Sequence, residues 1–205
     1  MKKYLVVSLV VLSLLVFSKT IHIKAGFVRP SEEKIEYVGN VILEVEEESF
    51  VLTSENLVIR KLEGKWRLTE ASSSVVVILE DGKLTGEHLV YDIETRQGTI
   101  TGNVEGEFLD KASTETIYIT CDSITFDLED NVFLGKGNVQ IEKGSIMASS
   151  EGFVYKREKG IIELSIDVNL EDSEKDLKMK ADRVTIDLEN DTMEASSVDV
   201  TLEVE

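Results

Sequence analysis

The stretch TGEHLVYDIETRQGTITGNV, residues 85–104, contains one complete structural unit of this chain. Its apolar residues Leu89, Tyr91 and Ile93 alternate with more polar ones, which is the period of a β-strand with one buried face. The cluster ETRQG that follows is rich in residues that favour turns. A second apolar and polar alternation then returns to Asn103-Val104. The stretch therefore predicts a β-hairpin.

Related windows recur along the chain and mark it as a repeat protein. They are TSENLVIR (53–60), TGEHLVYD (85–92), TCDSITFD (120–127), SSEGFVYK (149–156) and KADRVTID (180–187). Each window has an acidic residue at its third position: Glu55, Glu87, Asp122, Glu151 and Asp182. These acids are about 30 residues apart, a period typical of stacked supersecondary units. We expect each acid to stand near the start of a strand, after a small residue such as Gly86 or Cys121.

The positions two and four residues after each acid are apolar or aromatic, so they share one face of the sheet. With Ile93 and Leu128, which continue the same alternation, they form the predicted inner face: Leu57, Ile59, Leu89, Tyr91, Ile93, Ile124, Phe126, Leu128, Phe153, Tyr155, Val184 and Ile186. The same parity adds Val41, Leu43, Val45 and Leu188. From the residues alone, this face either closes on itself as a sandwich core or lines a trough.

Two segments interrupt the regular spacing of the units. Residues 61–82, which contain the single tryptophan Trp66, are expected to be an insertion after the first strand. Residues 106–119 are expected to be an extension before the third window. No Gly/Ser-rich linker divides the chain, so residues 26–205 are predicted to form a single domain.

The first 25 residues have the layout of a secretory signal. Lys2 and Lys3 precede an apolar run from Tyr4 to Phe17, which is shorter than the roughly 20 residues of a membrane-spanning helix. The cleavage site is poor, with Val16/Ser18 and Ile23/Ala25 as the only small-residue candidates. We predict an exported, periplasmic protein with a signal peptide at 1–25; an uncleaved N-terminal membrane anchor is the alternative.

The charge of the chain excludes one class of partner. The formal net charge is −18, and it becomes more negative without the lysines of residues 1–25. A body this acidic repels phosphate backbones, so a nucleic-acid partner is not expected. The single cysteine, Cys121, cannot form an internal disulfide.

The motif Gly-Asn-Val at 39–41, 102–104 and 137–139, phased with the acidic windows, resembles the OstA-like β-domain family. This family comprises the periplasmic lipopolysaccharide transport proteins LptA and LptC and the N-terminal domain of LptD. The resemblance covers most of the chain from Ile35 onward. It implies an all-β fold, an elongated and twisted antiparallel β-jelly roll that is open along one side and contains about five hairpin units.

The same resemblance implies a function for the inner face. It implies a groove that shields the acyl chains of lipopolysaccharide, or of a similar amphiphilic lipid, between the inner and outer membranes. Two alternatives stay open: an LptC-like component anchored in the inner membrane, and a structural cell-envelope protein with a closed core. The resemblance adds other OstA-like domains as expected partners, bound by edge-strand addition at Ile35–Val45 or Val198–Val204. A head-to-tail homo-oligomer would use the same edges.

No motif of the sequence indicates catalysis, a metal site or a cofactor. Neither an H-E-x-x-H, a G-x-S-x-G nor a P-loop motif is present. Cys121 has no histidine near it in sequence, and His88 is expected to be a solvated position of the sheet. The acidic runs at 44–49 and 170–176 lack the glycine and terminal glutamate of a calcium loop. We therefore expect a binding protein and not an enzyme.

Overall fold

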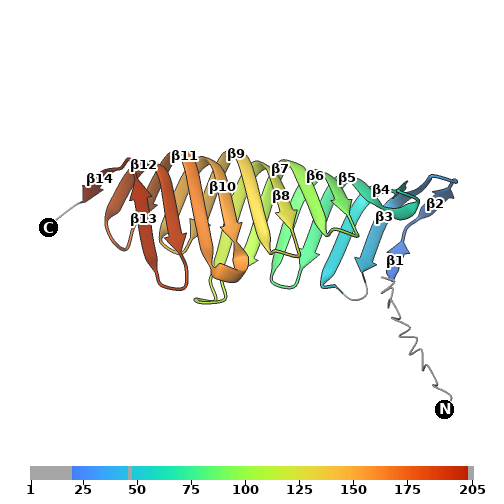
Figure 1. Cartoon of the computed structure of the whole chain (residues 1–205), viewed down its shortest axis with the longest axis horizontal. Helices are drawn as coiled ribbons and strands as arrows, with labels where there is room; N and C mark the ends of the chain where they lie inside the picture. The colour runs from blue at the N-terminus through green and yellow to red at the C-terminus, as the bar shows by residue number, and fades with distance from the viewer. Residues whose placement is uncertain (1–19, 46–47, 203–205) are drawn as a thin grey trace, which may run out of the picture.

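A computed structural model describes residues 20–45 and 48–202 of the chain (Figure 1). The described residues form β-strands joined by turns and one short 3₁₀ turn, η1, and the whole is a single 14-stranded sheet. The strands are β1 (Ile21–Lys24), β2 (Phe27–Pro30), β3 (Lys34–Val45), β4 (Phe50–Leu62), β5 (Lys65–Leu79), β6 (Gly82–Asp92), β7 (Gln97–Leu109), β8 (Thr116–Asp127), β9 (Val132–Lys143), β10 (Ile146–Lys156), β11 (Ile161–Asp172), β12 (Leu177–Asp187), β13 (Thr192–Ser196) and β14 (Asp199–Leu202), with η1 at Arg157–Lys159.

The strands follow one another along the sheet in the order of the sequence. From β3 to β13 every strand is antiparallel to the next, while β1 and β2 both pair with β3 and β14 pairs with β12. The register of β6 and β7, from His88↔Thr101 to Asp92↔Gln97, is that of the hairpin predicted from residues 85–104. The all-β, open antiparallel architecture is therefore confirmed.

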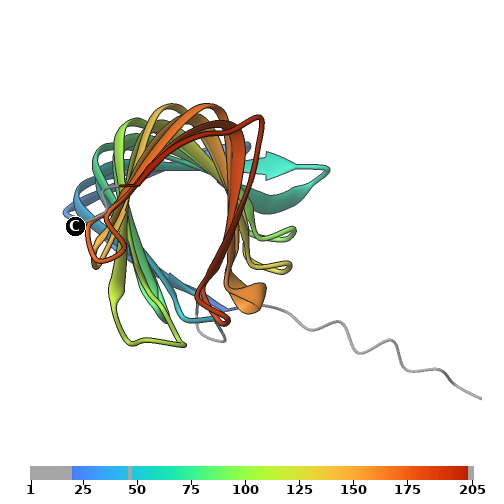
Figure 2. The ribbon, with the colours of Figure 1, turned by 90° about the vertical axis from the view of Figure 1, so that its left-hand side faces the viewer.

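The sheet curls around its long axis without closing on itself. Viewed end-on, it forms an arch whose strands run across the axis and whose turns lie on the two sides of an opening (Figure 2). The turns after β3, β5, β7, β9 and β11 lie on one side, here called flank A. The turns after β4, β6, β8, β10 and β12 lie on the other, flank B, and the line where the flanks meet is called the seam.

The recurring acids mark the point where each outgoing strand bends. In β8, Ile119 and Cys121 are buried, Asp122 and Ser123 both turn outward, and Ile124 is buried again. The pairing between β7 and β8 shifts register at this point, which is the behaviour of a β-bulge. The bulge reverses the parity of inner and outer residues, so the strand bends around the interior.

This geometry corrects the predicted position of the acids. Each one lies in the middle of its strand on the convex side, and all five are exposed: Glu55, Glu87, Asp122, Glu151 and Asp182. The residues before the acid, which include Gly86 and Cys121, are thus mid-strand and not at a strand start. The alternation on both sides of the acid belongs to one continuous strand. The acid lies where the order of buried and exposed residues changes parity.

Returning strands bend at the same level through two successive residues with positive φ. Gly137 and Asn138 have φ of +75° and +49°, and the Gly-Asn pairs at 39–40 and 102–103 repeat this conformation. Glycine and asparagine are the residues that adopt it at least cost. The Gly-Asn-Val motif is therefore the bend of a returning strand.

The two predicted interruptions of the repeat are largely regular strand. Residues 61–82 contain the end of β4 and all of β5, which pairs with β4 and β6. Its bend uses Ser73 and Ser74, with φ of +66° and +55°, and so lacks the Gly-Asn signature. The prediction of an insertion was therefore wrong. Residues 106–119 are the end of β7, a loop at 110–115 and the start of β8.

The N-terminal edge of the sheet also differs from the predicted one. β3 is covered by β1 and β2, so the edge expected at Ile35–Val45 is already paired. β1 comes from residues assigned to the predicted leader, and the half-buried Ile21 and Ile23 pack against the core. Residues 1–19, which carry most of the predicted leader, lie outside the described residues. At the other end, β14 forms from the predicted edge Val198–Val204.

Candidate lipid-binding interior

The structure brings all predicted groove residues together on the inner face of the arch. Each of them is buried, with Leu128 the most exposed at 7%. Val41, Leu43, Val45 and Leu188 are buried in the same continuous core. The interior is thus filled by its own side chains, and its lining from β3 to β12 is mainly apolar, with the buried Thr69 as a polar member. The parity prediction for the inner face is confirmed, while a lipid-binding role for it stays a prediction.

Aromatic rings form a row along the flank B side of this interior. Tyr91, Phe126, Phe133 and Tyr155 follow one another with ring centroids 6.0–6.4 Å apart. All four lie at or near the turns on flank B, because they are close to the ends of β6, β8 and β10 and the start of β9. Phe133 lies on a returning strand, outside the windows that carried the sequence prediction.

Two rings from flank A contact this row across the interior. Phe50, at the start of β4, stacks on Tyr91 with centroids 4.5 Å apart. Phe108, near the end of β7, meets Phe133 edge-on at 4.8 Å and Tyr155 at 5.6 Å. The aromatic contacts therefore join the two flanks from inside, at two places along the molecule.

Glycines opposite the rings make room for them. Gly98 pairs with Phe126 and Gly135 pairs with Phe153 across neighbouring strands. A Cβ atom on Gly135 would lie 1.9 Å from the Phe153 ring, and one on Gly98 would lie 2.5 Å from the Phe126 ring. Each ring thus lies over the backbone of its partner strand, and these glycines have a packing role.

Ion pairs cross the seam directly outside the aromatic contacts. Arg96 Nε of flank B lies 3.4 Å from Glu48 Oε1 of flank A. Arg157 Nη1 of flank B lies 2.6 Å from Asp81 Oδ1 of flank A, and both side chains are only 10% exposed. A third pair, Lys175 with Asp191 at 3.5 Å, is exposed. Sequence reasoning missed these residues, because they lie in turns that are far apart in the sequence.

Two buried tyrosines lie near charged residues of the turns. Burial, followed by the charge of Glu48, raises the pKa of Tyr91, whose hydroxyl makes no hydrogen bond to the described residues. Burial, followed by the charge of Asp110, raises the pKa of Tyr155 to about 12, and Arg157 and Asp81 also act on it. Both tyrosines therefore stay neutral within the buried interior.

Cys121 has a structural role at the bulge of β8. Its Sγ atom donates to the carbonyl oxygen of Ser123 at 3.3 Å. Ser54 and Ser150, at the same place in their own strands, make the equivalent bond to Asn56 and Gly152 at 2.9 and 3.0 Å. Burial raises the pKa of the Cys121 thiol to about 11. The thiol therefore closes a local hydrogen bond and is not prepared for nucleophilic chemistry.

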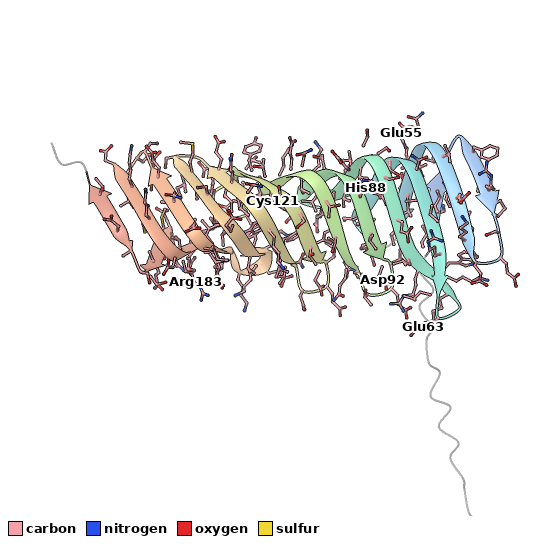
Figure 3. The ribbon with its side chains drawn as sticks, turned by 90° about the horizontal axis from the view of Figure 1, so that it is seen from above. Glu55, Glu63, His88, Asp92, Cys121 and Arg183 are labelled. Carbon is pink, nitrogen blue, oxygen red and sulfur yellow. The ribbon has the colours of Figure 1, made fainter. Side chains whose placement is uncertain are left out.

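The outer surface carries polar side chains. His88 is exposed on the outer face, as expected, and Glu63 and Asp92 lie on the same long edge (Figure 3). Across residues 20–45 and 48–202, His, Cys, Asp and Glu side chains do not form a group of three or more that could hold a metal ion. Within the same ranges, none of the structure is a helix long and apolar enough to cross a membrane.

A shallow hollow of about 710 Å³ lies on the outer face of β8–β12 and β14. Two rows of outward residues line it, and the most exposed apolar ones are Tyr118 and Met147. Charged side chains of both signs, including Glu142 and Lys178, surround them. The buried core residues Ile141, Ala148, Leu170 and Met179 also line it.

Solved structures resemble this chain in fold, and LptH is one of them. Neither a known protein-family profile nor a curated protein matches the sequence. The crystal structure of LptH, the LptA homologous periplasmic component of the lipopolysaccharide transport device of Pseudomonas aeruginosa, aligns with 91% of this chain and 96% of its own. The identity is 7% and the TM-score is 0.30. A TM-score this low leaves the function to be decided on the geometry of this chain.

Proposed function

We propose that this protein binds the acyl chains of an amphiphilic lipid in its interior and carries or shields them in the periplasm, as an LptA-like component of lipopolysaccharide transport does. One observation carries the proposal: a continuous apolar face lies behind a seam that no strand pairing closes. The phased sequence resemblance to the OstA-like family adds support.

The energetics of burial are adequate for such a ligand. An acyl chain gains about 0.8 kcal/mol for each methylene removed from water, so a chain of about a dozen methylenes needs no specific polar contact. Because the lining side chains fill the interior in this structure, the flanks must move apart to admit a chain. Backbone hydrogen bonds run along the axis between neighbouring strands, so they do not oppose this movement directly.

A second function is favoured by the complete burial of the inner face. Leu43, Tyr91 and Ile124 are 0% exposed, as in an ordinary sandwich core. A structural cell-envelope protein with a permanently closed interior would show the same packing. The two functions differ in whether a lipid ever contacts the buried rings.

Site-specific photo-crosslinking separates the two functions. A photoreactive phenylalanine analogue at Phe126 or Tyr155 should form adducts with lipopolysaccharide in the periplasm, detected as a shifted band that carries the lipid. Tyr118 provides a matched control, since it lies in β8 with Phe126 but points outward and is 50% exposed. Adducts from the inner positions alone support the carrier; repeated absence of adducts there identifies the closed core.

Membrane anchoring is a separate question within this proposal. An LptC-like component would retain its N-terminal segment, whereas an LptA-like one would lose it on export. Fractionation of cells into soluble periplasmic and membrane parts, with mass measurement of the exported chain, distinguishes them. We expect the soluble, shortened form.

A further inference from the structure

We infer that the seam is a lateral gate, closed by two clasps, through which the acyl chain enters the interior sideways. The inference rests on the proposed function and names the residues that control access. The first clasp is the Glu48–Arg96 pair outside the Phe50–Tyr91 stack. The second is the Asp81–Arg157 pair outside Phe108, Phe133 and Tyr155.

Each clasp joins flank A to flank B through side-chain contacts alone. Glu48 and Phe50 come from the β3–β4 turn region, while Tyr91 and Arg96 come from the β6–β7 turn region. When the flanks separate, the stack and the ion pair of a clasp break together. No ladder hydrogen bond has to break, since those bonds join neighbouring strands along the sheet and the strand pairing does not cross the seam.

In the second clasp, both charged residues have additional partners on their own flank, which stay in place when the clasp opens. Asp81 Oδ2 lies 3.2 Å from Lys111 Nζ, and both residues belong to flank A. Arg157 Nη2 donates to Asn131 Oδ1 at 2.7 Å, and its guanidinium lies 5.6 Å from the centre of the Phe133 ring, both on flank B. Isolated buried charges are costly, so such partners lower the cost of opening.

The closed clasps leave polar atoms without hydrogen bonds. Arg157 Nε and Nη1 and Arg96 Nε are buried and make no hydrogen bond to the described residues, although Nη1 lies close to Asp81. Most buried polar groups of folded proteins are satisfied. The seam is therefore held by charge attraction with poor hydrogen-bond geometry, which suits a contact that opens repeatedly.

Access along the axis is opposed by the aromatic row. A chain entering from one end would have to displace Tyr91, Phe126, Phe133 and Tyr155 in succession, because they are contiguous and buried. A chain entering sideways displaces only the flank A rings Phe50 and Phe108 from that row.

A reversible cross-link tests the gate. In a Cys121→Ser background, Asp81→Cys and Arg157→Cys are joined by a short bismaleimide with a reducible centre. The matched control joins Lys65→Cys and Glu94→Cys, an exposed pair 2.8 Å apart within flank B. The readout is the association rate of a fluorescent fatty-acyl amphiphile with the purified chain.

We expect the cross-seam link to slow association at least tenfold and reduction to restore the rate, while the control stays within twofold. An unchanged rate in the linked protein overturns the gate, because the chain then enters from an end, and leaves the proposed function intact. No binding in either reduced protein overturns the proposed function together with its gate. Arg157→Gln, which needs no cross-link, should accelerate association.

Discussion

Asn138 of β9 donates two hydrogen bonds from Nδ2 to the carboxylate of Asp122 in β8, at 3.0 and 3.2 Å. The pair joins the bend of a returning strand to the bend of the outgoing strand beside it. Asn103 and Glu87 repeat the relationship one unit earlier at 3.3 Å. The recurring acid and the recurring Gly-Asn are thus two halves of one corner.

Replacing Asn138 with alanine should lower the free energy of unfolding by about 1–2 kcal/mol, because the corner loses a hydrogen bond to a charged group and gains a strained alanine at positive φ. Urea unfolding followed by circular dichroism measures the change. Asn138→Gly removes the hydrogen bond but relieves the backbone, so it should lie between alanine and the natural residue. Equal stability of all three proteins would show that the corner is not held this way.

Gly135→Ala should destabilise the fold by about 1–3 kcal/mol, since the added methyl group collides with the buried Phe153 ring. Gly152→Ala, in the neighbouring strand, is the control: its Cβ would be no closer than 3.4 Å to other atoms. The same denaturation assay applies to both. Combining Gly135→Ala with Phe153→Leu should recover part of the loss, and absence of any recovery would contradict the proposed collision.

Ile166→Gly should stabilise the protein by about 1 kcal/mol. Ile166 occupies the first bend position of β11 with φ of +67°, a conformation that strains a β-branched residue, and its side chain is 61% exposed. Ile78→Gly is the matched control, because Ile78 is also exposed but lies in regular strand; it should destabilise by about 0.5–1 kcal/mol. Thermal unfolding of the two variants should give shifts of opposite sign.

The stability contributed by Asp110 should depend on pH. Burial opposes its ionisation, but hydrogen bonds from Ser113 and Ala112 and the nearby Lys143 outweigh burial and lower its pKa. A lowered folded-state pKa stabilises the fold above the unfolded pKa, near 4, and this stabilisation is lost as the pH falls through the folded value.

The difference in free energy of unfolding between the natural protein and Asp110→Asn should therefore be largest near neutral pH and shrink below about pH 4. Denaturant titrations at several pH values measure it. Asp182→Asn, at an exposed corner, is the comparison and should show only a small difference. A constant difference for Asp110→Asn down to pH 3 would refute the assignment.

A chain that begins after Ala25 should be less stable than one that begins after Ser18, by about 1–3 kcal/mol. The shorter form loses β1, whose Ile21 and Ile23 pack against the core and whose four residues pair with β3. If a leader is removed on export, cleavage after Ser18 therefore retains the complete sheet. Comparable stability of the two truncated chains would make β1 dispensable.

The inner face was predictable because its signal is local. Residues such as Leu89 and Tyr91 alternate with period two after each acid, and the buried face follows directly from that alternation. The bends were harder to predict, since a bulge changes the parity within a strand. Tyr118 and Phe126 are eight residues apart in β8, yet one points outward and the other inward.

The seam was not predictable from the same patterns. Which turns meet across it depends on how far the whole sheet curls, and that is a property of every bend together. The β3–β4 turn meets the β6–β7 turn, while the β5–β6 turn meets β10–β11. No local pattern around Asp81 or Arg157 indicates which turns will face each other. From the sequence, the two residues that we infer control access to the interior therefore look like ordinary charged residues of turns.

Between β3 and β12 the strands pair in the order of the sequence, which makes the length of this molecule adjustable. Each hairpin pairs only with the hairpins on either side of it, and neighbouring strands are about 4.8 Å apart, so one unit of two strands adds roughly 10 Å. Duplication or loss of a single genetic segment of about 30 codons would change the span by one such step while keeping the cross-section. The length of the molecule can therefore change in evolution without a change in the cross-section that determines what the interior binds.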